Sequence, residues 1–90
     1  KAGLNALTLA MAEAWSPKVR ANLVMPGAFD TDITKAWAPD TKEAAGRSNP
    51  MKRIGRPEDM VPVCLLLACD AGAFVNGAQI LVDGGTFRTL

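Results

Sequence analysis

The spacing of apolar residues changes along this chain, and this change constrains the fold more than any other feature of the sequence. Apolar residues recur at helical spacing over residues 2–15 and at every second position over residues 19–25. Helical spacing returns over residues 57–68, and a second strand-like run covers residues 79–82. This order predicts an α/β chain in which two parallel strands are joined by a right-handed crossover.

The first helical segment is apolar on nearly every side, with polar residues only at Lys1, Asn5, Thr8 and Glu13. A helix of this kind is covered on more than one side, so we expect a core helix or a helix shared with a partner subunit. The chain begins inside this pattern, and no capping residue precedes it. We therefore interpret the 90 residues as a fragment, which by itself exposes apolar surface of this helix on more than one side.

The charge balance and the cysteine content exclude several classes of protein. The 90 residues suffice for one small domain, and 10 basic against 9 acidic side chains argue against a nucleic-acid binder. No apolar run approaches the ~18 residues that span a membrane. Cys64 and Cys69 occur without any histidine, which excludes the usual zinc sites and a disulfide scaffold. We expect a soluble cytoplasmic chain without a metal site, in which both cysteines are buried.

The first strand is followed by a turn in a position where ligands commonly bind. Proline ends the strand at Pro26-Gly27 and glycine permits a tight turn. Residues 30–32, Asp-Thr-Asp, then offer capping oxygens for a short helix that runs through Trp37. Open α/β sheets bind ligands at such a turn, at the carboxyl end of a parallel strand. Trp37 either lines a substrate cleft or packs within the loop.

The segment 38–56 is richer in polar, glycine and proline residues than the rest of the chain. It carries one weak helix near residues 39–45, with breaks expected at Gly46 and at Asn49-Pro50. A connection of this length within a compact domain predicts a functional lid or a mobile loop. Its basic cluster is read as a solvated face, with contact to a 2′-phosphate or an acidic substrate as the alternative; the cluster consists of Lys52, Arg53 and Arg56.

Four motifs together resemble the C-terminal part of a short-chain dehydrogenase/reductase. They are the opening KAGLNALTLAMAEAW, the turn VRANLVMPGAFDTDI, the run RIGRPEDM and the closing FVNGAQILVDGG. Each is weak alone, but all four occur in the right order and at suitable spacing, over nearly the whole chain. The resemblance implies that residues 1–90 form the C-terminal segment of a single Rossmann-like domain, a doubly wound parallel sheet. Residues 31–56 are its substrate lid, and the N-terminal cofactor-binding part is absent.

The resemblance also implies the site residues and an NAD or NADP cofactor. Lys1 matches the lysine that binds the nicotinamide ribose and assists a catalytic tyrosine four residues before it. Positive charge of this kind lowers a tyrosine pKa from about 10. In the turn, Pro26 and Gly27 set the shape, the Phe29 backbone meets the nicotinamide carboxamide, and the Thr31 hydroxyl bonds the cofactor. The chain contains no tyrosine, so the fragment alone is expected to be inactive.

Two functions follow as hypotheses. The first is part of an NAD(P)-dependent oxidoreductase that transfers hydride between nicotinamide and a secondary alcohol or ketone. The second is a non-catalytic, self-associating piece produced by truncation or proteolysis. Open strand edges and the apolar first helix predict a homo-oligomer, and the family resemblance implies a dimer or tetramer. Neither nucleic acid nor a membrane is expected as a partner.

Overall fold

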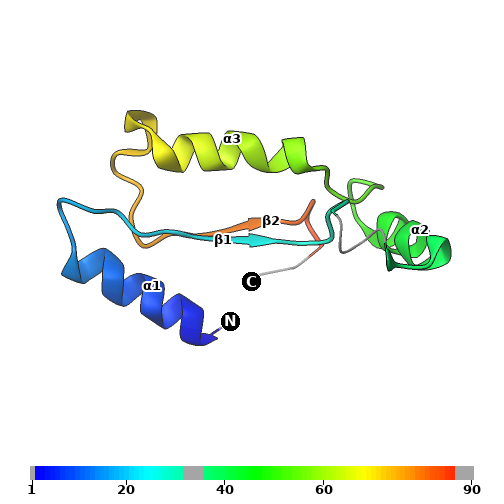
Figure 1. The fold of residues 1–90 in the computed structure, drawn as a ribbon, viewed down its shortest axis with the longest axis horizontal. Coiled ribbons are helices and arrows are strands. Elements are labelled where there is room, and N and C mark those ends of the chain that lie inside the picture. Colours follow the sequence, from blue (N-terminus) through cyan, green and yellow to red (C-terminus); the bar gives the residue numbers. More distant parts are fainter. Residues whose placement is uncertain (1, 32–35, 87–90) are drawn as a thin grey trace.

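The computed structural model describes residues 2–31 and 36–86 as helices flanking a short parallel sheet (Figure 1). Its elements, in chain order, are α1 (Ala2–Ala14), β1 (Leu23–Pro26), α2 (Pro39–Ser48), α3 (Pro57–Ala68), the 3-10 helix η2 (Asp70–Gly72) and β2 (Gln79–Val82). The sequence predicted α1, α3 and β2 closely. None of the described helices is long and apolar enough to cross a membrane.

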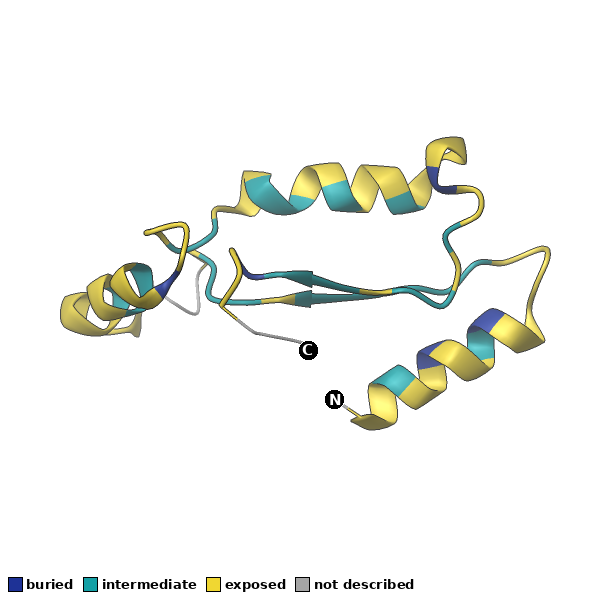
Figure 2. Ribbon diagram, turned by 180° about the vertical axis from the view of Figure 1, so that it is seen from behind, coloured by how far each residue is buried: buried dark blue, intermediate teal, exposed yellow. Residues whose placement is uncertain are grey.

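The two strands pair in parallel, which confirms the predicted architecture. Their register runs from Leu23 opposite Gln79 to Pro26 opposite Val82. Helix α3 runs along one side of the strand pair and α1 lies on the other side, as seen from both directions in Figures 1 and 2. Helix α2 lies beyond the carboxyl end of β1 (Figure 1). This arrangement leaves the carboxyl ends of both strands beside the loops that enter and leave α2.

Strand β1 is shorter than the predicted run over residues 19–25, because side chains replace part of the strand ladder. Asn22 donates from Nδ2 to the carbonyl of Val75 (2.9 Å) and accepts the N–H of Ala78 at Oδ1 (2.9 Å). The N–H of Ala21 is likewise held by Oδ1 of Asn76 (2.9 Å). The regular ladder therefore begins only at Leu23, and it includes Pro26, which the sequence placed outside the strand.

Helix α2 is longer than predicted, and it continues through Gly46 to Ser48. One glycine costs a helix only about 1 kcal/mol relative to alanine, which a neighbouring contact readily offsets. The helix ends at Ser48, and the N–H of the following residue, Asn49, donates to the carbonyl of Gly46 (3.3 Å). The short helix predicted to start at residues 30–32 falls largely on residues 32–35, which lie outside the described part of the chain.

Burial is sparse, and most residues of the helices α1 and α3 are exposed (Figure 2). Ala12 is the one buried apolar side chain of the described core, at 5% exposure. Exposed apolar residues on the two helices include Leu4, Leu7 and Leu9 of α1 and Val61, Leu65 and Leu66 of α3. The exposed apolar side chains of α1 agree with the prediction that these 90 residues alone leave apolar surface of this helix uncovered.

The prediction that both cysteines are buried is wrong. Cys64 and Cys69 are free and exposed. Cys64 belongs to α3 and Cys69 follows its last residue. Within the described chain α3 has the strand pair along one side only, so side chains on its remaining surface stay in contact with solvent (Figure 1).

Candidate functional site

The turn 26–31 extends directly from β1 along the end of β2. The N–H of Gly27 donates to the carbonyl of Val82 (3.0 Å), which adds one ladder bond beyond the last strand residue. A Cβ at Gly27 would lie 2.7 Å from the Cβ of Asp83, closer than real Cβ contacts come. Glycine is therefore required here by the close approach of the two chains, and the turn is held against the end of β2.

Phe29, at the centre of this turn, forms an isolated parallel bridge with Gly55. Gly55 donates its N–H to the carbonyl of Ala28 (2.8 Å) and accepts the N–H of Asp30 (2.7 Å). In a parallel bridge the partner bonds to the two neighbours of the bridged residue. The N–H and C=O of Phe29 itself consequently point toward the opposite edge, where they present one donor and one acceptor.

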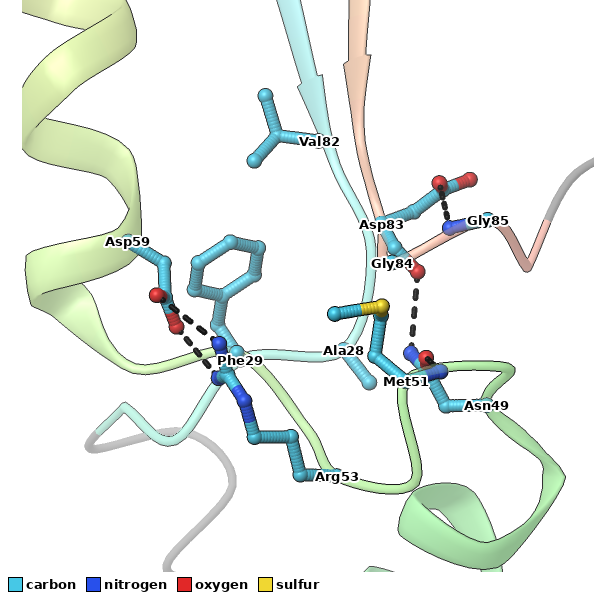
Figure 3. A pocket seen from close by; sticks show the side chains of 11 residues that line it. Ala28, Phe29, Asn49, Met51, Arg53, Asp59, Val82, Asp83, Gly84 and Gly85 are labelled. Atoms are coloured by element: carbon cyan, nitrogen blue, oxygen red, sulfur yellow. Dashed lines mark hydrogen bonds and ion pairs between the residues drawn. The ribbon is translucent and has the colours of Figure 1, made fainter.

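A pocket of about 390 Å³ lies between the two strand ends and the start of α3. Phe29, Met51 and Val82 supply apolar surface, while charged and amide side chains stand on either side of them (Figure 3). The full lining consists of Ala28, Phe29, Asn49, Met51, Arg53, Gly55, Asp59, Val82, Asp83, Gly84 and Gly85. Three segments far apart in sequence thus meet at the carboxyl ends of the parallel strands.

One side of the pocket carries an ion pair with two contacts between Arg53 and Asp59 (Figure 3). The distances are 2.6 Å from Nη1 to Oδ2 and 3.1 Å from Nη2 to Oδ1. Asp59 also accepts the N–H of Arg56 (2.7 Å) at the start of α3. The hydrogen bonds from Arg53 and from the Arg56 backbone lower the pKa of Asp59 to about 2. Of the predicted basic cluster, Arg53 is thus engaged within the chain.

The last residues of the turn contact α2. Asp30 forms an ion pair with Lys42, with 2.8 Å between Oδ1 and Nζ. Thr31 follows and is exposed. The predicted residues Pro26, Gly27, Phe29 and Thr31 therefore share this one turn, which leads from β1 toward α2.

Lys1, the predicted catalytic residue, lies outside the described residues. Trp37 is 36% exposed, which does not distinguish the two roles that the sequence left open for it. Among residues 2–31 and 36–86 no group of three or more histidine, cysteine or acidic side chains could hold a metal ion.

The sequence did not predict that Asn49 and Asp83 contribute to the site. Asn49 belongs to the pair Asn49-Pro50, which predicts only an interruption of helix, and Asp83 directly follows the predicted strand 79–82. The structure joins them by a hydrogen bond from Nδ2 of Asn49 to the carbonyl of Asp83 (3.0 Å). Residues that end a helix or a strand indicate where loops begin. Their spacing in the sequence does not indicate which loops lie together in the fold.

Comparison with known proteins identifies the family. A family model described as enoyl-(acyl carrier protein) reductase matches residues 1–86. The chain also superposes on a short-chain dehydrogenase/reductase of Brucella melitensis, glucose/ribitol dehydrogenase by its description, with a TM-score of 0.90 and 30% identity. The chain belongs to the short-chain dehydrogenase/reductase family. The superposition covers 99% of this chain and 36% of the Brucella chain, and it confirms the predicted Rossmann-like fold class.

Two curated relatives illustrate the range of this dehydrogenase/reductase family. A 2-dehydro-3-deoxy-D-gluconate 5-dehydrogenase of Pseudoalteromonas atlantica is 40% identical, over 94% of this chain and 35% of its own length. An L-rhamnose 1-dehydrogenase (NAD(P)(+)) of Azotobacter vinelandii is 39% identical, over 100% of this chain and 36% of its own length. The chain thus spans about a third of the length of these relatives, which agrees with the prediction that it is part of a longer family member.

Proposed function

We propose that these residues belong to an NAD(P)-dependent oxidoreductase that transfers hydride between nicotinamide and a secondary alcohol or ketone. The observation that carries this proposal is the position of the turn 26–31. It lies at the carboxyl end of a parallel strand, and the bridge to Gly55 leaves the Phe29 peptide groups on the opposite edge. Membership of the family and the two relatives described above, both dehydrogenases by name, also support this proposal.

The residues of the turn fit a nicotinamide carboxamide. A carboxamide has one acceptor and a pair of donor hydrogens, so a main-chain N–H and C=O at one edge match it. Phe29 supplies these two groups, and the bonds of Gly55 to Ala28 and Asp30 hold the peptides on both sides of it. Preorganised groups of this kind bind with less loss of conformational freedom.

Each predicted site residue has a role in this proposal. Pro26 and Gly27 fix the path of the turn, Phe29 orients the carboxamide, and the hydroxyl of Thr31 donates to the cofactor. For Lys1 we propose the role that the family resemblance implies. Its ammonium group binds the ribose hydroxyls. The positive charge also lowers the pKa of a neighbouring tyrosine hydroxyl toward neutrality, so that the tyrosine can transfer a proton. When bound, the nicotinamide supplies or accepts the hydride.

The segment 31–56 is proposed to cover the substrate, as the lid of the same domain. Helix α2 is tied to the turn by the ion pair of Lys42 and Asp30. Since both side chains are partly exposed, at 32% and 46%, this contact is weak enough to open. Substrate that binds near Thr31 would thus lie beside an element able to move relative to the turn.

We further propose that the enzyme is a cytoplasmic homo-oligomer. The exposed apolar residues of α1 and α3 favour burial against other protein surface. The same observation favours the second candidate function, a self-associating piece without activity. Light scattering tests the assembly, and a monomer at micromolar concentration would contradict it.

The decisive experiment combines two measurements on one sample of the purified protein. The intact mass establishes which polypeptide is present, and fluorescence titrations with NADH and NADPH measure binding. Saturable binding by a polypeptide longer than these 90 residues supports the oxidoreductase, and the preferred nucleotide identifies the cofactor. A mass that matches the 90 residues, without binding, supports the inactive piece. A longer polypeptide that binds neither nucleotide would overturn the proposed oxidoreductase.

A further inference from the structure

Asn49 is a buried polar residue whose side-chain nitrogen and oxygen each form a hydrogen bond with the backbone. Its exposure is 6%. The Nδ2 group donates to the carbonyl of Asp83 (3.0 Å), and Oδ1 accepts the N–H of Met51 (2.8 Å). Its own carbonyl accepts the N–H of Lys52 (2.8 Å). Buried amides are tolerated when both ends are bonded in this way, so Asn49 fixes the start of the loop 49–55 against the end of β2.

The fit around this contact is close. Gly84 has a φ of +65°, and a Cβ there would lie 2.5 Å from Oδ1 of Asn49. Lys52, inside the loop, has a φ of +61°, a left-handed conformation that residues other than glycine rarely adopt. Such a conformation persists only where surrounding contacts determine it, and the bond from Lys52 to Asn49 is one of them.

The other end of the loop 49–55 holds the turn 26–31. Gly55 bonds to Ala28 and to Asp30, on either side of Phe29. The loop therefore links the end of β2 to the turn after β1, with Asn49 at one end and Gly55 at the other. Besides this link, the start of the turn is attached to β2 by the bond from Gly27 to Val82, and its end is attached to α2 by the partly exposed ion pair of Asp30 and Lys42.

We propose that Asn49 is a positioning residue for the turn that binds nicotinamide. It acts through the loop 49–55, since its hydrogen bond to Asp83 holds the loop and the loop in turn holds the peptides around Phe29. This inference rests on the proposed oxidoreductase function. Loss of the anchor lets the turn sample other conformations, so binding of the cofactor then has to order it.

Two substitutions in the full-length protein test this role. Asn49→Ala removes both side-chain bonds. Asn49→Asp keeps the size of the side chain and the acceptor for Met51, but it replaces the donor with an oxygen facing the Asp83 carbonyl. Glu58→Gln is the control, because Glu58 is exposed, lies outside both the segment 31–56 and the lining of the pocket, and the substitution likewise exchanges a carboxylate and an amide.

We expect both variants to raise the KM of the nicotinamide nucleotide about fivefold or more. A change of this size corresponds to the free energy of roughly one hydrogen bond. The kcat should stay within about twofold, because Asn49 does not touch the reacting groups. Glu58→Gln should change neither constant. A purely structural role would lower Tm and leave KM unchanged at temperatures where the protein is folded.

The outcomes separate this inference from the proposed function. An unchanged KM in a folded, active Asn49→Asp variant overturns the positioning role, and this variant decides the question even where Asn49→Ala does not fold. If the unsubstituted full-length protein binds neither NADH nor NADPH, the proposed oxidoreductase function fails, and the positioning role fails with it.

Discussion

The ring of Phe29 lies directly over Gly55, so that a Cβ at position 55 would stand 2.6 Å from Cε2 of the ring. The same two residues form the parallel bridge that ties the loop 49–55 to the turn 26–31. The contact therefore fixes both the path of the backbone and the place of an aromatic side chain in the pocket. The turn and the loop can approach this closely only because residue 55 is a glycine and has no Cβ.

Gly55→Ala is expected to lower the free energy of unfolding by about 1–3 kcal/mol, because the added methyl overpacks the contact with Phe29. Urea denaturation of the full-length protein measures this change. The matched control is Gly3→Ala in α1, where, beyond its chain neighbours and the backbone of its own helix, no atom of residues 2–31 or 36–86 lies within 4 Å of an added Cβ. That substitution should stabilise the helix by about 0.5–1 kcal/mol. Equal effects of the two substitutions would contradict the steric account.

The ion pair of Asp59 predicts a specific pH dependence of stability. Because hydrogen bonds from Arg53 and the Arg56 backbone hold the pKa of Asp59 at about 2, below its ordinary 3.8, the ionised form stabilises the folded state. This contribution is complete above about pH 4 and is lost as the pH falls toward 2. Asp59→Asn should thus be less stable than the unsubstituted protein at pH 7, and the difference should shrink in acid.

Denaturation midpoints at pH 7 and pH 3 check this expectation. Glu58→Gln serves as the control, since Glu58 is the other acidic residue in the first turn of α3 and is exposed. Because Glu58→Gln leaves the ion pair of Arg53 and Asp59 in place, this variant should keep the acid-dependent loss of stability that the ion pair predicts. A difference for Asp59→Asn that stays constant from pH 7 to pH 3 would show that the ion pair does not stabilise the fold.

Arg20 is expected to stabilise the end of α3. Its guanidinium donates to the carbonyl of Leu67 (2.8 Å) and to that of Val75 (3.2 Å), and positive charge at a helix carboxyl end is favourable. Arg20→Lys keeps the charge but cannot reproduce both bonds, so the free energy of unfolding should fall by about 1–2 kcal/mol. Lys18→Ala, at an exposed position nearby, should change it by less than about 0.5 kcal/mol. Thermal unfolding compares the two variants.

Thr31 provides a direct test of the proposed cofactor site. Thr31→Ala should raise the dissociation constant of the preferred nicotinamide nucleotide about fivefold, because one hydrogen bond is lost. Thr31→Ser retains the hydroxyl and should bind within about twofold of the unsubstituted protein. Fluorescence titration of the full-length protein measures both constants. Weak binding by the serine variant as well would assign the effect to the methyl group rather than to the hydroxyl.

Local sequence patterns predicted a helix or strand well where its ends are set by residues within or next to that element. Strand β2 begins at Gln79 and ends at Val82, as the apolar run and the following Asp-Gly-Gly indicate. The prediction for β1 was less accurate because Asn22 and its neighbours bond to residues near Val75 through side chains. Alternation of apolar residues is the same whether the backbone or a side chain satisfies the peptide groups, so it could not reveal this difference.

The candidate site likewise has one part that the sequence predicted and one part that it did not. The turn 26–31 was predicted because proline, glycine and threonine carry its features in sequence order, and four of the predicted residues lie on it. Its support by Asn49 and Gly55 was not predicted. Those contacts depend on how the long segment after the turn returns to the strand ends, and polar loop composition does not determine that path.

By itself, the sequence determined the order of helices and strands, their parallel pairing and membership of the short-chain dehydrogenase/reductase family. These properties follow from periodicity, turn residues and motif order, which are local or linear features of a chain. The tertiary structure alone decided which loops meet and which side chains stay exposed. The bond from Asn49 to Asp83 joins residues 34 positions apart, and that from Arg20 to Leu67 joins residues 47 apart. Contacts at such separations are set by the packing of whole elements, since no local preference of either residue specifies its partner.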